Sequence, residues 1–176
     1  LTLDERLTRF WQERIAALNN TGCFTVGIVW GGRKSRLNAN RSMRLDDLAV
    51  LFQLYGVKWF SLQVGDDSQQ LDRFCDCVEN IAADFVTFVD TAAAIVNLDM
   101  VITIDTSVAH LCGALGKPAF VLLKYGADWR WMLERCDSPW YNSLQLFRQQ
   151  QPGDWQSVVS AVQKKMEAAC VKEKRC

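Results

Sequence analysis

Short apolar runs alternate with amphipathic segments along most of this chain, and polar turns separate them. Runs of β-branched and aromatic residues are typical of strands buried in a parallel sheet, whereas apolar residues spaced three and four apart are typical of helices. The pattern predicts strands over residues 24–30, 57–63, 85–89, 100–104, 119–123 and 144–147. It predicts helices over residues 3–18, 45–54, 71–78, 91–97 and 108–115, a short helix ending at residue 135, and a terminal helix that starts at residues 152–154.

The order of these elements is strand, loop and helix, repeated about five times, which is typical of an α/β domain. We therefore predict a Rossmann-like fold with a mostly parallel sheet and helices on both faces. The chain has 176 residues, of which 49% are hydrophobic, and this suits one domain with a sizeable core. In such folds ligands bind outside the carboxyl ends of the strands, so the loops after residues 30, 104 and 123 are the candidate binding elements.

The segment 99–123 holds one complete strand–turn–helix–turn–strand unit, around which the rest of the pattern is arranged. Its first turn, Asp105-Thr106-Ser107, follows a strand directly and begins a helix of small residues. The first N–H groups of a helix lack partners within the helix and carry partial positive charge, so they can bind an anion such as phosphate. The hydroxyls of Thr106 and Ser107 would either bind that anion as well or only cap the helix.

Two further residues lie close to this turn. His110 follows Thr106 by one helical turn on the same face, where it either reaches the anion or has a structural role. Asp105 would repel a phosphate, so we expect it to fix the turn through backbone N–H groups. No paired carboxylates and no Ser-His-Asp or Cys-His arrangement stand out, and no catalytic residue is predicted.

The loop after the first strand, residues 31–44, is the second candidate binding element. It begins with Gly31 and Gly32, which allow the backbone to approach a ligand closely. Within the loop, a stretch of twelve residues contains five cations, namely Arg33, Lys34, Arg36, Arg41 and Arg44. Because arginine favours bidentate contacts with phosphate oxygens, the loop is predicted to clamp a diphosphate; the simpler interpretation is a solvated surface loop.

Composition and missing signatures disfavour several other functions. Neither loop matches the G-x-G-x-x-G or G-x-x-x-x-G-K-[ST] pattern. Twenty basic and twenty acidic side chains balance, which gives no support for a nucleic-acid partner. The one histidine and seven scattered cysteines offer no zinc-site spacing, so we expect no metal and free thiols in the cytoplasm. No apolar run approaches the roughly 18 residues of a membrane-spanning helix.

Several motifs in combination are similar to those of a known family. They are V-G-I-V-W-G-G at 26–32, Arg41-Ser42, Ser61-Leu62-Gln63 and D-T-S-V-A-H-L-C-G-A-L-G-K-P at 105–118. This combination resembles the C-terminal half of bacterial ADP-heptose:lipopolysaccharide heptosyltransferases and of related transferase domains found behind tetratricopeptide repeats. D-W-R-W at 128–131, D-S-P-W-Y at 137–141 and L-F-R-Q at 146–149 resemble the repeat-linked branch in particular.

The resemblance implies the C-terminal half of a glycosyltransferase B-type fold, in which two Rossmann-like domains face a cleft. Residues 1–22 would form a linking helix, and residues 23–176 would bind a nucleotide-diphospho-sugar, ADP- or UDP-linked. By this likeness the donor diphosphate is bound by Arg41, Thr106, Ser107 and Val108, and His110 supports the turn. A second tier of residues consists of Gly31, Gly32, Arg33, Lys34, Asp105 and Asp128, the last of them near sugar hydroxyls.

The resemblance also implies an inverting reaction without metal or cofactor, because basic side chains and a helix dipole stabilise the leaving nucleoside diphosphate. The family's catalytic carboxylate usually lies on an N-terminal domain, which we expect this chain to lack. The isolated chain should then bind donor weakly without transferring sugar, and should need the N-terminal domain or repeat region of a parent protein. Two alternatives stay open, a non-catalytic interaction module with this fold and a nucleotide-dependent epimerase or dehydrogenase.

Overall fold

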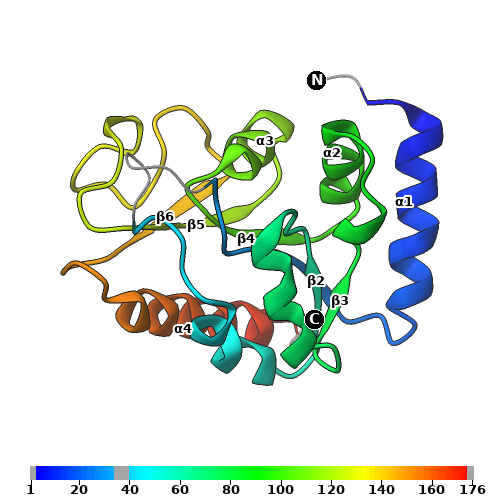
Figure 1. The fold of residues 1–176 in the computed structure, drawn as a ribbon, viewed down its shortest axis with the longest axis horizontal. Helices are drawn as coiled ribbons and strands as arrows, with labels where there is room; N and C mark the ends of the chain where they lie inside the picture. The colour runs from blue at the N-terminus through cyan, green and yellow to red at the C-terminus, as the bar shows by residue number, and fades with distance from the viewer. Residues whose placement is uncertain (1–2, 34–39, 174–176) are drawn as a thin grey trace.

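The computed structural model describes residues 3–33 and 40–173. Six parallel strands form one sheet in the order β3-β2-β1-β4-β5-β6 (Figure 1). Their bounds are β1 Phe24–Val29, β2 Val57–Ser61, β3 Val78–Asn80, β4 Met100–Ile104, β5 Ala119–Leu123 and β6 Leu144–Arg148. The strand order reverses between β1 and β4, which is the arrangement of a doubly wound Rossmann-like sheet. The predicted fold class is confirmed.

Helices cover both faces of the sheet, and each layer has its own apolar core. On one face lie α1 Glu5–Leu18, α2 Phe88–Val96 and α3 Ser107–Leu115; on the other lie α4 Trp155–Glu173 and the 3₁₀ segment η2 Leu45–Gln53 (Figure 1). The strands send alternate side chains to the two layers, so that Val29 joins the first core and Ile28 joins the second. This two-sided burial explains why the strand sequences are apolar throughout.

The first helix packs into the same core as the sheet. Asp4 caps α1 by accepting a hydrogen bond from the Arg6 N–H at 2.8 Å, and Trp11 and Ile15 are buried on its inner face. The Trp11 indole N–H donates to the Asp90 carboxylate of α2 at 3.4 Å. The division of the chain at residue 22 stays a prediction, although α1 is joined to the sheet layer by these contacts.

The central unit folds as predicted. All five residues of β4 are buried, and α3 follows after a two-residue turn. Gly116 ends α3 with φ +67°, a left-handed conformation that favours glycine, and the Lys117 N–H bonds back to the Cys112 carbonyl at 2.9 Å. The next residues form β5 beside β4, so the candidate turn at 105–107 lies at the carboxyl edge of the sheet.

The strand predicted over residues 85–89 is wrong. Helix α2 begins there instead, because the Thr87 hydroxyl accepts from the Val89 N–H and the Asp90 carboxylate accepts from the Thr87 N–H. Val86, Phe88 and Val89 are exposed rather than paired in the sheet. The edge strand is β3, which at three residues is too short to give an apolar run.

Three predicted helices differ from the observed elements. The helix predicted over residues 71–78 is replaced by a 3₁₀ segment, η3 Asp66–Arg73, which starts earlier after Gly65 with φ +79°. The segment predicted over 45–54 is present but has 3₁₀ geometry. The helix expected to reach residue 135 is only η5 Trp129–Trp131, because Met132 takes φ +58° and breaks the turn. A further short segment, η4 Ala82–Asp84, follows β3.

Candidate functional site

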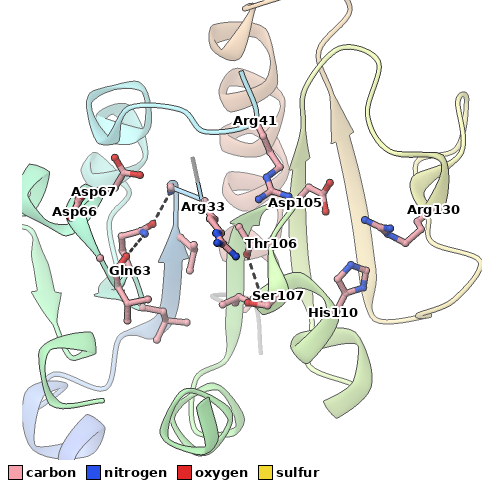
Figure 2. A pocket seen from close by; sticks show the side chains of 17 residues that line it. Arg33, Arg41, Gln63, Asp66, Asp67, Asp105, Thr106, Ser107, His110 and Arg130 are labelled. Carbon is pink, nitrogen blue, oxygen red and sulfur yellow. Dashed lines mark hydrogen bonds between the residues drawn. The ribbon is translucent and has the colours of Figure 1, made fainter. Parts of the chain in front are cut away.

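A cavity of about 730 Å³ opens beyond the carboxyl ends of β1, β2 and β4 (Figure 2). It lies where the strand order reverses, which is the usual ligand position in a sheet of this kind. Most of the residues predicted from the sequence line it, namely Gly31, Gly32, Arg33, Arg41, Asp105, Thr106, Ser107, Val108 and His110. Lys34 lies outside the described residues, and Asp128 is not part of the lining.

The start of α3 forms the floor of this cavity. The Thr106 hydroxyl accepts from the Val108 N–H at 3.3 Å (Figure 2). It also lies 3.2 Å from the Thr103 hydroxyl, which itself donates to the Ile104 carbonyl. Thr106 is therefore the helix cap. The Ser107 side chain is exposed beside it, so its hydroxyl is available to an anion, whereas the Val108 N–H is taken by the Thr106 cap and the Ala109 N–H bonds to the Thr106 carbonyl at 3.1 Å.

Asp105 does not have the role that the sequence suggested. In the described part of the chain, no backbone N–H donates to its carboxylate, and the cap of α3 comes from Thr106 instead. Asp105 is only 8% exposed, yet it lines the cavity and forms no ion pair with a described residue. A buried carboxylate without a partner is costly, so contacts of this group with water or a ligand would be favourable.

Gln63 is a site residue that the sequence did not single out. Its side-chain carbonyl accepts from the Trp30 N–H at 3.1 Å and the Gly31 N–H at 2.7 Å, while its amide N–H donates to the Val64 carbonyl (Figure 2). It thereby holds the loop after β1 against the end of β2. The signals in the sequence were its position as the last residue of the strand predicted over 57–63 and its place in the motif Ser61-Leu62-Gln63.

The glycines of this loop permit two close approaches. A Cβ on Gly31 would lie within 2.7 Å of three side-chain atoms of Asp67, and one on Gly32 would lie 3.0 Å from a terminal nitrogen of Arg41. Gly31 therefore lets the Asp67 side chain pack directly against the loop after β1.

The described lining carries both signs of charge. Arg33, Arg41 and Arg130 supply three cations, whereas Asp66, Asp67 and Asp105 supply three carboxylates. Figure 2 shows Arg33, Arg41 and Asp105 around the middle of the cavity, with Asp66 and Asp67 at one end and Arg130 and His110 at the other. The Nε atoms of Arg41 and Arg130 are buried and have no hydrogen-bond partner among the described residues.

Arg44 is not part of this cluster. It pairs with Asp46 at 3.0 Å on the outer surface of η2, which corrects the expectation that all the cations of the loop act together. The predicted clamp is thus reduced, within the described residues, to Arg33 and Arg41.

Arg130 reaches the cavity from the long segment between β5 and β6. Asp128 fixes it, since its carboxylate accepts from the Arg130 N–H at 3.1 Å and lies 3.3 Å from the guanidinium. Arg148 of β6 donates to the carbonyls of Trp131 and Arg135 and so fastens this segment to the sheet. Asp128 therefore positions a cavity residue but does not itself face the cavity.

His110 lies beside Arg130 at the end of the cavity (Figure 2). Its ring stacks on Trp131 with centroids 5.2 Å apart, and its Nδ1 is 3.3 Å from the Tyr141 hydroxyl. Burial lowers the pKa of His110 below its usual range; the Asp105 carboxylate opposes this shift and the Arg130 guanidinium adds to it. The imidazole is therefore neutral at neutral pH.

Within residues 3–33 and 40–173, no cluster of three or more His, Cys, Asp or Glu side chains has the arrangement of a metal site. Over the same residues, no helix combines the length and the apolar character needed to cross a membrane.

Comparison with known proteins gives one distant relative of note. Protein FlbA of Caulobacter vibrioides is 27% identical to this chain over 146 residues, which cover 78% of this chain and 24% of FlbA. The chain thus spans about a quarter of that protein's length. No family model matches the chain.

Proposed function

We propose that this chain binds a nucleotide-diphospho-sugar, ADP- or UDP-linked, as the donor-binding part of a metal-independent inverting glycosyltransferase of the heptosyltransferase-like type. The observation that carries the proposal is the start of α3, which meets Arg33 and Arg41 in one cavity where the strand order reverses. Helix N–H groups, hydroxyls and guanidinium groups together suit a diphosphate.

The arrangement of charge along the cavity also suits a diphosphate that carries a group at each end. Arg33 and Arg41 lie near the middle together with Asp105, while Asp66 and Asp67 lie at one end and Arg130 and His110 lie at the other. Carboxylates accept hydrogen bonds from the hydroxyls of a ribose or a sugar, which are neutral. At about 730 Å³ the cavity falls within the usual size range for small-molecule sites.

In this proposal the chain supplies half of a transfer site. The basic side chains and the α3 dipole stabilise the leaving nucleoside diphosphate in the transition state. The acceptor and its activating base belong to a partner domain or repeat region, and the reaction takes place in the cytoplasm. The isolated chain binds donor and does not transfer sugar.

A second candidate is a non-catalytic interaction module that keeps the transferase-like fold. It is favoured by the balance of three arginines against three aspartates in the described lining, which gives little net attraction for a polyanion. Such a module would leave the cavity without a nucleotide ligand.

Calorimetric titration with ADP, UDP, GDP, ADP-glucose, UDP-glucose and NAD separates these candidates. Binding of a nucleoside diphosphate or its sugar ester, weakened at least about tenfold in Arg41→Ala and in Thr106→Ala, supports the proposal, since a charge-assisted contact contributes about 1.5–3 kcal/mol. Arg44→Ala is the matched control, because it removes a cation of the same loop that lies outside the cavity. No binding across the panel would favour the interaction module, and binding of NAD alone would overturn the proposal.

A further inference from the structure

Three aromatic side chains from separate parts of the chain meet at the end of the cavity that Arg130 lines. His110 comes from α3, Trp131 from η5 and Tyr141 from the segment before β6. The His110 ring stacks on Trp131 at an interplanar angle of 22°, and it meets the Tyr141 ring edge-on with centroids 5.9 Å apart. Trp131 is fully buried, so this cluster holds the imidazole in one plane.

Helix α3 is shaped to admit Tyr141. A Cβ at Gly113 would lie within 2.7 Å of three ring atoms of Tyr141, so only glycine lets this ring pack against the helix. Gly113 lies three residues after His110, on the same side of α3. The glycine thus allows the Tyr141 hydroxyl to come within 3.3 Å of the His110 Nδ1.

This contact decides which nitrogen of His110 is available to a ligand. With Nδ1 engaged by Tyr141, Nε2 is the remaining nitrogen, and it has no hydrogen-bond partner among the described residues. In a neutral imidazole one nitrogen carries the proton and the other accepts, and the partner of one nitrogen fixes the state of the other.

We propose that Tyr141 is a positioning residue that donates its O–H to Nδ1 of His110, and thereby holds the neutral imidazole as the Nε2–H tautomer, which donates to the ligand phosphate. This inference rests on the proposed function, because it specifies how one residue of that same site meets the anion. The opposite tautomer would turn a lone pair towards phosphate oxygens, which also carry lone pairs.

The surroundings of His110 favour this assignment. Asp105, in the turn before α3, is a carboxylate that attracts an N–H of His110 pointing into the cavity. Arg130 and Asp128 carry opposite charges and pair with each other, so their effects on His110 partly cancel. Burial keeps the ring neutral, so its donor capacity depends on the tautomer rather than on protonation. The exposed Ser107 hydroxyl, which lines the same cavity at the start of α3, can also donate to the ligand.

The chain offers an unusually direct test, because His110 is its only histidine. Nitrogen-15 NMR of the imidazole distinguishes a protonated from an unprotonated nitrogen without overlap from other residues. In the free protein at pH 7.5–8 we expect a protonated Nε2 and an unprotonated Nδ1, and in Tyr141→Phe we expect the two tautomers to mix. An Nδ1–H tautomer in the wild-type chain would overturn the proposal, whether or not any nucleotide binds.

Affinity measurements then connect the tautomer to the ligand. ADP binding should weaken about three- to tenfold in Tyr141→Phe, the loss of roughly one hydrogen bond, while Tyr125→Phe in the same segment should leave it unchanged. In a His110→Gln background the Tyr141→Phe substitution should have no further effect. Equal losses in both backgrounds would show that Tyr141 acts on folding alone and would refute its positioning role. Failure of the wild-type chain to bind ADP, UDP or their sugar esters would refute the proposed function instead.

Discussion

Replacing Gly113 by alanine should destabilise this protein, although the same change stabilises most helices. An alanine in a helix interior is normally favoured over glycine by about 1 kcal/mol. Here the added Cβ would lie within 2.7 Å of Cγ, Cδ1 and Cδ2 of Tyr141, which are atoms of a rigid ring and not the end of a flexible chain. Tyr141 or α3 must therefore move.

The magnitude follows from two opposing effects. Insertion of a methyl group into a well-packed contact costs about 1–3 kcal/mol, and three ring contacts place this site in the upper part of that range. Subtracting the gain in helix propensity, about 1 kcal/mol, leaves a net loss of about 1–2 kcal/mol. For a chain of this length that corresponds to a melting temperature lower by roughly 2–8 °C.

Urea denaturation followed by circular dichroism measures this loss. Ser160→Ala, at an exposed position of α4, is the control in which alanine should give its ordinary small gain. The decisive comparison is Gly113→Ala in a Tyr141→Ala background, where the ring is gone and alanine should now stabilise by about 1 kcal/mol. If Gly113→Ala stabilises the wild-type chain as well, Tyr141 does not pack against α3 as described.

Three further results are expected. Gln63→Ala leaves the buried backbone N–H groups of Trp30 and Gly31 without partners, so it should lower the free energy of unfolding by about 2–4 kcal/mol. Urea denaturation measures this loss, and Gln69→Ala, at an exposed position, is the control. Burial opposes ionisation of Asp90, but its hydrogen bonds outweigh this and lower its pKa, so stability should fall as the pH drops below about 4, and less steeply in Asp90→Asn. Burial raises the pKa of Cys112 to about 12, so iodoacetamide at pH 7.5 should modify exposed Cys136 but not Cys112, as peptide mass spectrometry would show.

Each of these results has a contrary outcome. A Gln63→Ala variant as stable as the control would mean that water replaces its hydrogen bonds to the β1 loop. Because the pKa of Asp90 is lowered by folding, there is a pH range in which its carboxylate is ionised in the folded chain but protonated in the unfolded chain. In that range acid favours unfolding. An identical acid slope in Asp90→Asn would contradict it, as would alkylation of Cys112 at the rate of Cys136.

The sequence predicted elements well where one local signal sufficed. The apolar run of β4 and the glycine stop of α3 each follow from a few adjacent residues, and both were placed correctly. The strand predicted over 85–89 failed because its apolar side chains are exposed, and because the Thr87–Asp90 cap outweighed β-propensity. β3 was missed because a three-residue edge strand is defined by its pairing with β2 and not by its own composition.

The same distinction applies to the site. The sequence alone determined that the basic loop 31–44 and the helix start at 105–107 each follow a strand directly. The spacing of hydrophobic residues marks the strands, and chain order then places both segments at carboxyl ends of strands. Only the tertiary structure decided that Gln63 holds the loop after β1 and that Arg44 pairs with Asp46 outside the cavity. It also decided that Asp105 lines the cavity without capping α3. It also brought Tyr141 to His110 across 31 positions of sequence, a contact that depends on how the segment after β5 folds back over α3. Such long-range contacts have no local signal, because packing between elements, and not the conformation of either one, determines them.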